Sequence, residues 1–509
     1  MTTTETVLPD WLARCAQHFP SHLALQYGPT RWTFSDLEQQ VTRLALQLAS
    51  AGVGEGSRIA LLAASGLQYV TCVHALTRLG AILVPLNTRL SQQELCWQVG
   101  DVRASLLVHD EQYAPVAAQI VRAVPELVCA TLADHAQDAE LVLRALPLAS
   151  VPLRAFIDLA ATQVIMYTSG TTGQPKGVII TYGMQWWSAI GSALNLGHSP
   201  DDCWLACMPL FHIGGLAILM RSVIYGISII LQEKFDALAV NRAICEERVT
   251  IISVVAVMLQ RMLAELDERG MAHYPTSLRC VLLGGGPAPL PLLEECARRN
   301  VPVVQTYGLT ESCSQAVTLA PTDSLRKLGS AGRPLLPVQL RIMQDERPDL
   351  PAPIGEPGVI YLKGPNITPG YVDRPEATAQ AIKDGWLSTG DIGYLDEDGY
   401  LYVLDRRSDL IISGGENVYP AQIEAVLLAH PDVEEAGACG IPDQQWGQVP
   451  IAFVRLRARS TASSDDLFSF ATQRLARYKL PRAIYIVDAL PRNGAGKLVR
   501  RDLPRLLPF

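Results

Sequence analysis

The stretch Val164-Ile-Met-Tyr-Thr-Ser-Gly-Thr-Thr-Gly-Gln-Pro-Lys-Gly-Val-Ile-Ile180 decides how the rest of the chain is interpreted. Apolar, β-prone residues at both of its ends predict two strands with a loop between them. The glycines let the backbone approach a ligand closely, while hydroxyl groups and one ammonium group supply hydrogen-bond donors and charge. Such a loop suits a bound polyphosphate. The residues assigned to this site are Thr168, Ser169, Gly170, Thr171, Thr172, Gly173 and Lys176.

This loop is not a Walker A loop, which needs Gly directly before its Lys and Ser or Thr directly after it. Here Lys176 stands between Pro175 and Gly177, which excludes the ordinary P-loop ATPases. The alternative is a Ser/Gly-rich surface turn. A surface turn has no need of several hydroxyls, glycines and a lysine between two apolar strands, so we predict a nucleotide phosphate site.

Length and composition exclude several classes of function. The 509 residues exceed one hydrophobic core and predict two or more domains. A net charge of −8 argues against nonspecific binding of nucleic acid or of an anionic membrane. The first ten residues lack the features of a signal peptide, and Arg221 interrupts the most apolar stretch, 214–231, so no membrane insertion is expected. The 11 cysteines show no zinc-site spacing, which is typical of reduced thiols in a cytoplasmic protein.

Alternating strand and helix patterns predict a mostly parallel sheet covered by helices. A helix is expected to begin within Thr33 to Asp36, and early strands are expected at 59–62, 81–84 and 105–109. Residues 130–160 are weakly patterned and are interpreted as a link between two subdomains. Beyond the phosphate loop the same alternation predicts strands at 204–207, 227–231, 250–255, 280–283 and 301–304.

The last third of the chain predicts two smaller units. From 328 to 405, short strands alternate with Gly/Pro turns, which indicates a small β-rich subdomain. A polar junction follows, and the remaining residues suffice for a separate domain with a helix at 420–428. The predicted fold class is therefore α/β. A large N-terminal domain (1–405) contains layered α/β subdomains and the β-rich subdomain, and a smaller, mobile α+β C-terminal domain (406–509) follows a hinge near 406–408.

Two further stretches place turns at the ends of predicted strands, where ligands commonly bind in α/β sheets. Leu282-Leu-Gly-Gly-Gly-Pro-Ala-Pro289 contains a glycine turn, and Gln305-Thr-Tyr-Gly-Leu-Thr-Glu311 a polar one. In the second, Tyr307 offers a flat face for a purine, Thr310 a hydroxyl for a phosphate, and Glu311 a carboxylate for Mg²⁺. Taken singly, each of these residues would be interpreted as part of a surface turn.

Two later motifs carry isolated charges. In Ser388-Thr-Gly-Asp391 the carboxylate could accept both hydroxyls of a ribose, and Arg406 could add a donor to the ribose or a phosphate. Leu490-Pro-Arg-Asn-Gly-Ala-Gly-Lys497 presents one lysine on a glycine-rich loop. A lysine near a terminus is most often solvated surface, but a flexible loop is also a means of delivering a charge to a distant site.

In this order the motifs resemble those of the adenylate-forming superfamily, which includes acyl-CoA synthetases, luciferases and peptide-synthetase adenylation domains. Members activate a carboxylate with ATP, forming an acyl-adenylate and pyrophosphate. The resemblance covers nearly the whole chain and is most specific at Tyr167 to Gly177. It implies ATP, Mg²⁺ and, as co-substrate, coenzyme A.

The same resemblance implies a role for each matching residue. Tyr307 and the turn of Gly284, Gly285 and Gly286 would bracket the adenine, and Asp391 and Arg406 would hold the ribose. Thr168, Thr171 and Glu311 would serve the phosphates and the metal, and Lys497 would bridge the carboxylate and the α-phosphate. After the C-terminal domain turns, Gly415 would line a narrow tunnel for CoA. The implied cofactor-binding set is completed by Pro287, Gly308, Thr310 and Trp446.

Two positions depart from the superfamily pattern. Ala495 stands where the last motif usually has Ser, which is a mild change in a loop. Ser408 occupies a hinge position that often carries Lys or Asp. Which polar interactions the hinge makes in the expected domain rotation is therefore undecided.

Three stretches are more particular: 211–217, 307–315 and 402–420. They resemble the 2-succinylbenzoate–CoA ligases of the menaquinone pathway. That acid carries two carboxylates and a ketone, so its pocket needs polar groups. The expected substrate-binding residues are His212, which is also expected to take part in catalysis, Ser314, Gln315 and Arg221.

The sequence leaves two features of this substrate pocket undecided. Arg221 is a candidate for the aromatic carboxylate, but it could equally cap a helix or pair on a surface. Gly214 and Ala217 stand where this subgroup often has Ser, so part of the expected polar lining is missing.

Three alternatives to this function remain. The chain could be an aryl- or fatty-acid CoA ligase of different acid specificity, an adenylation domain that loads a carrier protein, or an inactive nucleotide-binding relative. The last conflicts with the presence of Lys176, Glu311, Asp391 and Lys497 together. The expected partners are a small carboxylic acid, ATP and CoA, with no nucleic acid, and the sequence leaves a monomer and a homodimer equally open.

Overall fold

The computed structural model describes residues 6–135, 138–142, 151–168, 175–286, 288–345, 347–406, 409–413, 416–443, 446–475, 477–493 and 497–507. In this part of the chain, two large α/β sheets are followed by a β-rich unit and a C-terminal unit. The predicted fold class is confirmed, with its layered α/β part, its small β-rich part and its smaller α+β part.

The first large sheet has the strand order β11-β10-β5-β4-β6-β7-β8 in the described residues. Its central strands run parallel, and the antiparallel pairs β10–β11 and β7–β8 form its two edges. The strands are β4 (Arg58–Leu62), β5 (Ile82–Pro85), β6 (Leu106–Asp110), β7 (Val128–His135), β8 (Asp138–Val142), β10 (Thr162–Thr168) and β11 (Lys176–Thr181). The expectation that 130–160 forms a link is wrong for the β7–β8 hairpin, which extends this sheet.

The second large sheet has the order β18-β17-β16-β15-β14-β12-β13-β2-β3 in the described residues, and its strands from β16 to β2 run parallel. The five strands predicted beyond the phosphate loop all occur here. The strands are β2 (Leu23–Tyr27), β3 (Thr30–Thr33), β12 (Cys203–Ala206), β13 (Ser228–Leu231), β14 (Ile251–Val254), β15 (Cys280–Leu283), β16 (Val303–Tyr307), β17 (Val317–Thr318) and β18 (Arg333–Pro334). A short pair outside both sheets joins β1 (Val7–Pro9) to β9 (Phe156–Asp158).

Alternate residues of the strands pack against different helix layers, as the period of two in a strand requires. In β4, Ile59 and Leu61 belong to the core between the two sheets, whereas Ala60 and Leu62 belong to the core on the outer face. The helices of the middle layer are α1 (Trp11–His18), α2 (Phe34–Ser50), α3 (Leu67–Leu79), α6 (Tyr182–Leu196) and α7 (Ile213–Tyr225). The outer helices are α4 (Gln92–Asp101) and α5 (Ala114–Ala123) on the first sheet, and α8 (Ala237–Glu246), α9 (Ala256–Glu268) and α10 (Leu290–Arg298) on the second.

The helix predicted to begin near Thr33 is confirmed. Thr33 caps α2 through its hydroxyl, which accepts from the Asp36 amide, and the Asp36 carboxylate accepts from the Thr33 amide. Satisfying two unpaired amides in this way fixes where the helix starts.

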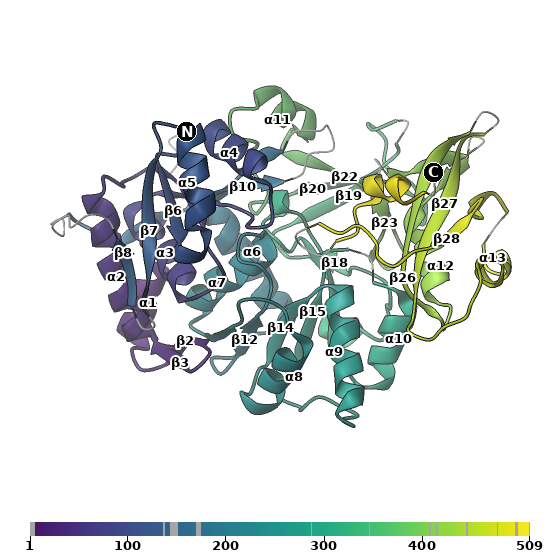
Figure 1. The fold of residues 1–509 in the computed structure, drawn as a ribbon, viewed down its shortest axis with the longest axis horizontal. Coiled ribbons are helices and arrows are strands. Elements are labelled where there is room, and N and C mark those ends of the chain that lie inside the picture. Colours follow the sequence, from purple (N-terminus) through teal and green to yellow (C-terminus); the bar gives the residue numbers. More distant parts are fainter. Residues whose placement is uncertain are drawn as a thin grey trace.

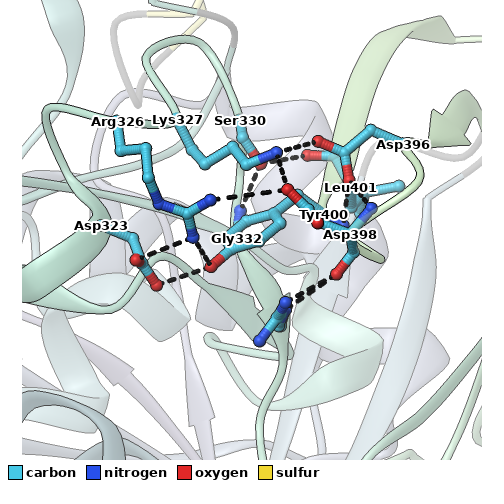
Figure 2. Close-up of polar contacts among 10 residues, drawn as sticks. Asp323, Arg326, Lys327, Ser330, Gly332, Asp396, Asp398, Tyr400 and Leu401 are labelled. Atoms are coloured by element: carbon cyan, nitrogen blue, oxygen red, sulfur yellow. Dashed lines mark hydrogen bonds and ion pairs between the residues drawn. The ribbon is translucent and has the colours of Figure 1, made fainter.

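The β-rich unit is bound to the second sheet by the network in Figure 2. Its strands are β19 (Gln339–Met343), β20 (Gly358–Lys363), β21 (Ile382–Lys383), β22 (Trp386–Leu395) and β23 (Leu401–Arg406), with α11 (Pro375–Ala381) beside them. In the turn between β22 and β23, Asp396 and Asp398 each lie 2.7 Å from Nζ of Lys327. The Tyr400 hydroxyl donates to Asp323 at 2.6 Å. These bonds fix β22, which carries Asp391, against the sheet that carries Tyr307.

The C-terminal unit lies at the opposite end of the long axis from β6, β7 and β8 (Figure 1). Its sheet has the order β25-β24-β27-β26, and β28 pairs with β27. Its elements are β24 (Ile411–Ser413), β25 (Glu416–Val418), α12 (Pro420–Leu428), β26 (Val433–Asp443), β27 (Gly447–Leu456), α13 (Ser464–Thr472), β28 (Ile484–Ile486) and the 3-10 helix η6 (Arg500–Leu506). The helix predicted at 420–428 is confirmed as α12.

Arg500, at the start of η6, binds three carboxylates. Its guanidinium binds Glu424 with two hydrogen bonds, of 2.8 and 2.7 Å, and Asp409 with one of 3.0 Å. It also binds Asp405, whose other oxygen accepts from the Ala421 amide at 2.8 Å. The cluster ties the end of β23 to the C-terminal unit.

We predict that Arg500→Met lowers the free energy of unfolding by about 3–5 kcal/mol, because it leaves buried carboxylates without their counter-ion. The measurement is urea unfolding followed by circular dichroism. Arg505→Met is the matched control, because Arg505 is exposed and its ion pair with Asp502 should contribute little. Equal effects of the two substitutions would contradict the prediction.

Candidate active site

The residues predicted to bracket the adenine meet at the carboxyl ends of two adjacent parallel strands. Gly284 and Gly285 follow β15, and Tyr307 ends β16. A Cβ on Gly284 would lie 2.9 Å from Cγ2 of Thr306, which is too close for a side chain. Gly285 has a φ of +84°, a conformation that residues other than glycine rarely adopt. This turn therefore exposes bare backbone to the site.

Tyr307 and Asp391 are joined directly. The Tyr307 hydroxyl donates a hydrogen bond of 2.7 Å to Oδ2 of Asp391, which is 5% exposed. Asp391 on β22 also pairs in register with Arg406 on β23. The structure thus brings together the residues predicted for the adenine and the ribose, which lie on different sheets. Pro287 and the side chain of Arg406 lie outside the described residues.

A tight turn after β16 presents the next predicted residues. Thr310 and Glu311 lie in the short 3-10 helix η2 (Thr310–Ser312). The chain then folds back so closely that a Cβ on Gly308 would lie 1.5 Å from the carbonyl oxygen of Ser314. Ser314 itself has a φ of 80°. Gly308 is therefore required by the turn itself, whether or not it contacts a nucleotide.

Thr168 and Lys176 stand at the two ends of the phosphate loop. Thr168 is the last residue of β10 and Lys176 the first of β11, and the two pair in register. The two predicted strands are confirmed. The loop residues between them, Ser169, Gly170, Thr171, Thr172 and Gly173, lie outside the described residues, so their roles stay predictions.

Tyr371 connects Glu311 with Lys176, and sequence reasoning missed it. Its hydroxyl donates a hydrogen bond of 3.1 Å to Oε1 of Glu311. Nζ of Lys176 lies 5.4 Å from the centre of its ring. The only signal in the sequence was the turn-like stretch Gly370 to Pro375, which carries no chemical motif.

Sequence reasoning also missed a second connection, near the end of β10, where the phosphate loop begins. The Tyr167 hydroxyl donates to Oδ2 of Asp101 at 2.7 Å, and Arg374 forms an ion pair with the same carboxylate. Burial, with the adjacent Asp101, raises the pKa of Tyr167, so its hydroxyl remains a donor. The base of the phosphate loop is thereby fixed to the end of α4.

Lys497 reaches this site from the C-terminal unit. Its Cε lies 3.4 Å from the position that a Cβ on Gly285 would take. Asn493 binds the backbone of Lys497 with two hydrogen bonds: its amide donates to the Lys497 carbonyl at 2.8 Å, and its side chain accepts from the Lys497 amide at 3.0 Å. Of the two expected arrangements, the structure therefore has the one with Lys497 in the site.

His212 is half-buried and lies close to Lys497, directly before α7. Burial is the main cause that lowers its pKa to about 4, and the positive charges of Lys497 and Arg89 lower it further. The imidazole is therefore neutral at pH 7. Its Nε2 has no hydrogen-bond partner among the described residues. A neutral imidazole of this kind can bind a polar group of a substrate.

Arg221 is fully buried on α7, so the alternative of a surface ion pair is wrong. Its Nη2 donates to the Ser188 hydroxyl at 3.1 Å, and that hydroxyl donates to the Cys313 carbonyl at 2.7 Å. Its guanidinium also lies 5.6 Å from the Trp204 ring centre, and within the described residues it forms no ion pair with a carboxylate. This chain of bonds leads to the turn that carries Ser314.

The remaining candidates differ in how they are placed. Gln315 is 1% exposed, and its Oε1 accepts from the Thr318 hydroxyl at 3.3 Å. Trp446 directly precedes β27 and is 47% exposed, and its amide donates to Oδ1 of Asp443 at 2.9 Å. Gly415 lies outside the described residues.

Comparison with protein families agrees with this geometry. The family described as AMP-binding enzyme matches residues 12–372, and the family described as AMP-binding enzyme C-terminal domain matches residues 422–497. The chain belongs to the AMP-binding enzyme family. The resemblance to the adenylate-forming superfamily is confirmed.

Relatives within the family are similar over the whole chain. The 2-succinylbenzoate–CoA ligase of Geobacillus kaustophilus is 54% identical over 503 residues, covering 99% of each chain. The o-succinylbenzoate CoA synthetase (MenE) of Bacillus subtilis, solved with ATP and a magnesium ion, is 43% identical with a TM-score of 0.89, covering 98% of this chain and 100% of that one. Solved with its acyl-adenylate intermediate OSB-AMP, the same enzyme has a TM-score of 0.88, covering 98% of each chain. The resemblance to this subgroup is confirmed as well.

The lowered pKa of His212 predicts a pH dependence of stability. Between pH 6.5 and about 4 the unfolded chain binds a proton at His212 that the folded protein does not, so folding weakens as the pH falls. In His212→Gln, the stability lost between pH 7 and pH 5 should be smaller by about 2 kcal/mol. Urea unfolding at the two pH values measures this.

The exposed His198 provides the control for this measurement. His198→Gln makes the same substitution at an exposed position, and the reduced loss of stability should be specific to His212→Gln. If His212→Gln loses as much stability on acidification as the wild type, His212 is not held neutral by burial.

Proposed function

We propose that the protein is an ATP-dependent acid–CoA ligase, an acid–thiol ligase. It activates 2-succinylbenzoate as an acyl-adenylate, releasing pyrophosphate, and then transfers the acyl group to CoA, as a step of menaquinone biosynthesis. Full-length similarity to 2-succinylbenzoate–CoA ligases supports this. The single observation that carries it is the position of Lys497, a cation delivered from the C-terminal unit to the turn at Gly285.

Lys497 is proposed to act in the first half-reaction. A carboxylate oxygen of the acid attacks the α-phosphorus of ATP, and the bond to pyrophosphate breaks. Negative charge accumulates at the α-phosphate, where Lys497 stabilises it. Tyr307 would lie against the adenine and Asp391 would accept the ribose hydroxyls, so that the α-phosphate falls near Lys497. The neutral His212 adds no like charge beside Lys497.

Glu311 is proposed to hold Mg²⁺ together with Thr168. Its carboxylate is a hard oxygen ligand, and the Tyr371 hydroxyl fixes its orientation. In the described part of the chain, no three His, Cys, Asp or Glu side chains gather into a site that could hold a metal. This fits Mg²⁺, which proteins usually bind through one or two carboxylates together with substrate phosphates. When bound, the ion neutralises charge on those phosphates.

The second half-reaction needs a different arrangement. The sulfur of CoA must reach the acyl carbon, while AMP leaves. We propose that the C-terminal domain (406–509) turns about a hinge near 406–408, which withdraws Lys497 and brings Gly415 to the CoA tunnel, with Trp446 on the CoA side. Hinges of this kind are a few loop residues that absorb a large change of backbone angles.

His212, Ser314, Gln315 and Arg221 are proposed to recognise the acid. His212 directly precedes α7, and Arg221 lies on it. The bonds from Arg221 through Ser188 reach the turn that carries Ser314. Gly214 leaves space, because a Cβ there would meet only Cε of Met208, at 3.9 Å. Gly214 therefore provides space for the substrate but no hydrogen-bond donor.

We also propose a cytoplasmic location, with a small carboxylic acid, ATP and CoA as the partners and no nucleic acid. The net charge of −8 supports this. Of the helices in the described residues, none combines the length and the apolar character needed to cross a bilayer.

We predict that 2-succinylbenzoate exceeds monocarboxylic acids by orders of magnitude in kcat/KM. A simple acid leaves buried polar groups unpaired, which costs about 1–3 kcal/mol per group, or about 5- to 150-fold each. The measurement is pyrophosphate release and CoA-thioester formation across a panel containing benzoate and octanoate. An equal or better rate with another acid would refute the substrate assignment.

For Lys497→Ala we predict adenylate formation slowed by about 10²–10³-fold, because one charge that stabilises a transition state is worth roughly 3–4 kcal/mol. Conversion of preformed acyl-adenylate to thioester should be nearly unchanged, because it makes no new bond to ATP. Single-turnover measurement of each half-reaction tests this, with Lys479→Ala as the control, because Lys479 belongs to the same unit but donates to Gln422 at 2.9 Å. Equal loss in both half-reactions would exclude the role.

A further inference from the structure

Tyr371 stands on a segment that is fixed to the strand carrying Lys176. The Val372 amide donates to the Gly177 carbonyl at 2.9 Å, and the Ile179 amide donates to the Gly370 carbonyl at 3.1 Å. The Thr368 hydroxyl donates to the Ile179 carbonyl at 2.6 Å. The backbone of Tyr371 is therefore held on β11 from both sides.

The same segment is also fixed to the turn that carries Glu311. The Thr368 amide donates to the Glu311 carbonyl at 2.7 Å. The Tyr371 hydroxyl then donates to the Glu311 carboxylate at 3.1 Å. Both the main chain and the side chain of Glu311 thus depend on residues 368–371, which belong to the β-rich unit.

The ring of Tyr371 faces the second charged group. Nζ of Lys176 lies 5.4 Å from the ring centre, within the range in which the negative face of an aromatic ring attracts an ammonium group. One side chain from the β-rich unit therefore contacts an anion from the second sheet and a cation from the first. These are the two charged residues assigned to the metal and the phosphates.

We propose that Tyr371 is a positioning residue for adenylation: its hydroxyl orients the carboxylate of Glu311 toward Mg²⁺, and its ring orients the ammonium group of Lys176 toward the ATP phosphates. The proposal rests on the proposed function. A hydrogen bond to a carboxylate selects one of its rotamers, and a ligand held in one orientation binds a metal more tightly than one that must be ordered on binding. A purely structural residue would affect stability but not the dependence on Mg²⁺.

Tyr371→Phe separates the two contacts, because it removes the hydroxyl and keeps the ring. The Mg²⁺ concentration for half-maximal pyrophosphate formation should rise about tenfold, the usual effect of losing a second contact to a metal ligand. The KM for 2-succinylbenzoate and the conversion of preformed acyl-adenylate to thioester should be unchanged. Tyr371→Leu removes the ring as well, and should also raise the KM for ATP.

Binding without turnover provides an independent measurement. With Mn²⁺ in place of Mg²⁺ and a non-hydrolysable ATP analogue, electron paramagnetic resonance measures how much metal the protein–nucleotide complex binds. Tyr371→Phe should weaken this binding by about tenfold. Tyr274→Phe is the matched control: Tyr274 is also partly buried and donates at 2.8 Å to a side chain, that of Asn241, outside the site. It should change neither measurement.

The outcomes separate the positioning role from the alternatives. Unchanged Mg²⁺ and Mn²⁺ dependence in folded Tyr371→Phe overturns the proposal, and so does an equal loss in both half-reactions. A lowered melting temperature without a shifted metal dependence assigns Tyr371 to the fold alone. Failure of the proposed function is distinguishable, because then the wild type itself would form no adenylate from 2-succinylbenzoate.

Discussion

The close approach of Lys497 to Gly285 is the constraint on which the site depends. A lysine from near the end of the chain has its Cε 3.4 Å from the position that a Cβ on Gly285 would occupy. Glycine is favoured there because its φ of +84° is rarely open to other residues and because a Cβ would lie 3.0 Å from Cγ1 of Val255. The turn after β15 and Lys497 therefore lie in contact, although they belong to different units. The orientation of the C-terminal unit thus determines whether a positive charge stands beside Gly285.

The protonation state of His212 determines whether Lys497 has a second positive charge beside it. His212, directly before α7, feels the charge of Lys497, and its pKa of about 4 keeps it neutral. Two neighbouring cations would repel each other, and a protonated His212 would weaken the effect of Lys497. The exposed Lys497 therefore has a neutral imidazole, and no second positive charge, at the position of His212. The amino end of α7 thus contributes a polar group without adding charge, whereas the cation of this helix, Arg221, lies two turns further along.

Local patterns in the sequence predict the elements and the motifs, but not the contacts that complete the site. The alternation of Ile59 to Leu62 and the cap at Thr33 depend on neighbouring residues alone, so strands and helices could be placed. The bonds of Tyr307 with Asp391 and of Tyr371 with Glu311 join residues 84 and 60 positions apart. Such pairs depend on how separate units pack. The β7–β8 hairpin was missed for a different reason, because an edge hairpin needs little of the apolar pattern that marks central strands.

The cluster around Arg500 shows how one orientation can be selected without being made permanent. Asp405 directly precedes the proposed hinge, and Arg500 follows Lys497 by three positions, so the proposed rotation that withdraws Lys497 has to rearrange the ion pair between Arg500 and Asp405. Removing charges from water costs nearly as much as their pairing returns, so a buried ion cluster adds little net stability. Its geometry is nevertheless demanding, because one guanidinium must meet three carboxylates at once. A hydrophobic contact of equal specificity would stabilise the same orientation more and make it slower to leave. An ionic cluster at this junction therefore suits the proposed rotation, in which one arrangement serves the first half-reaction and another serves the second.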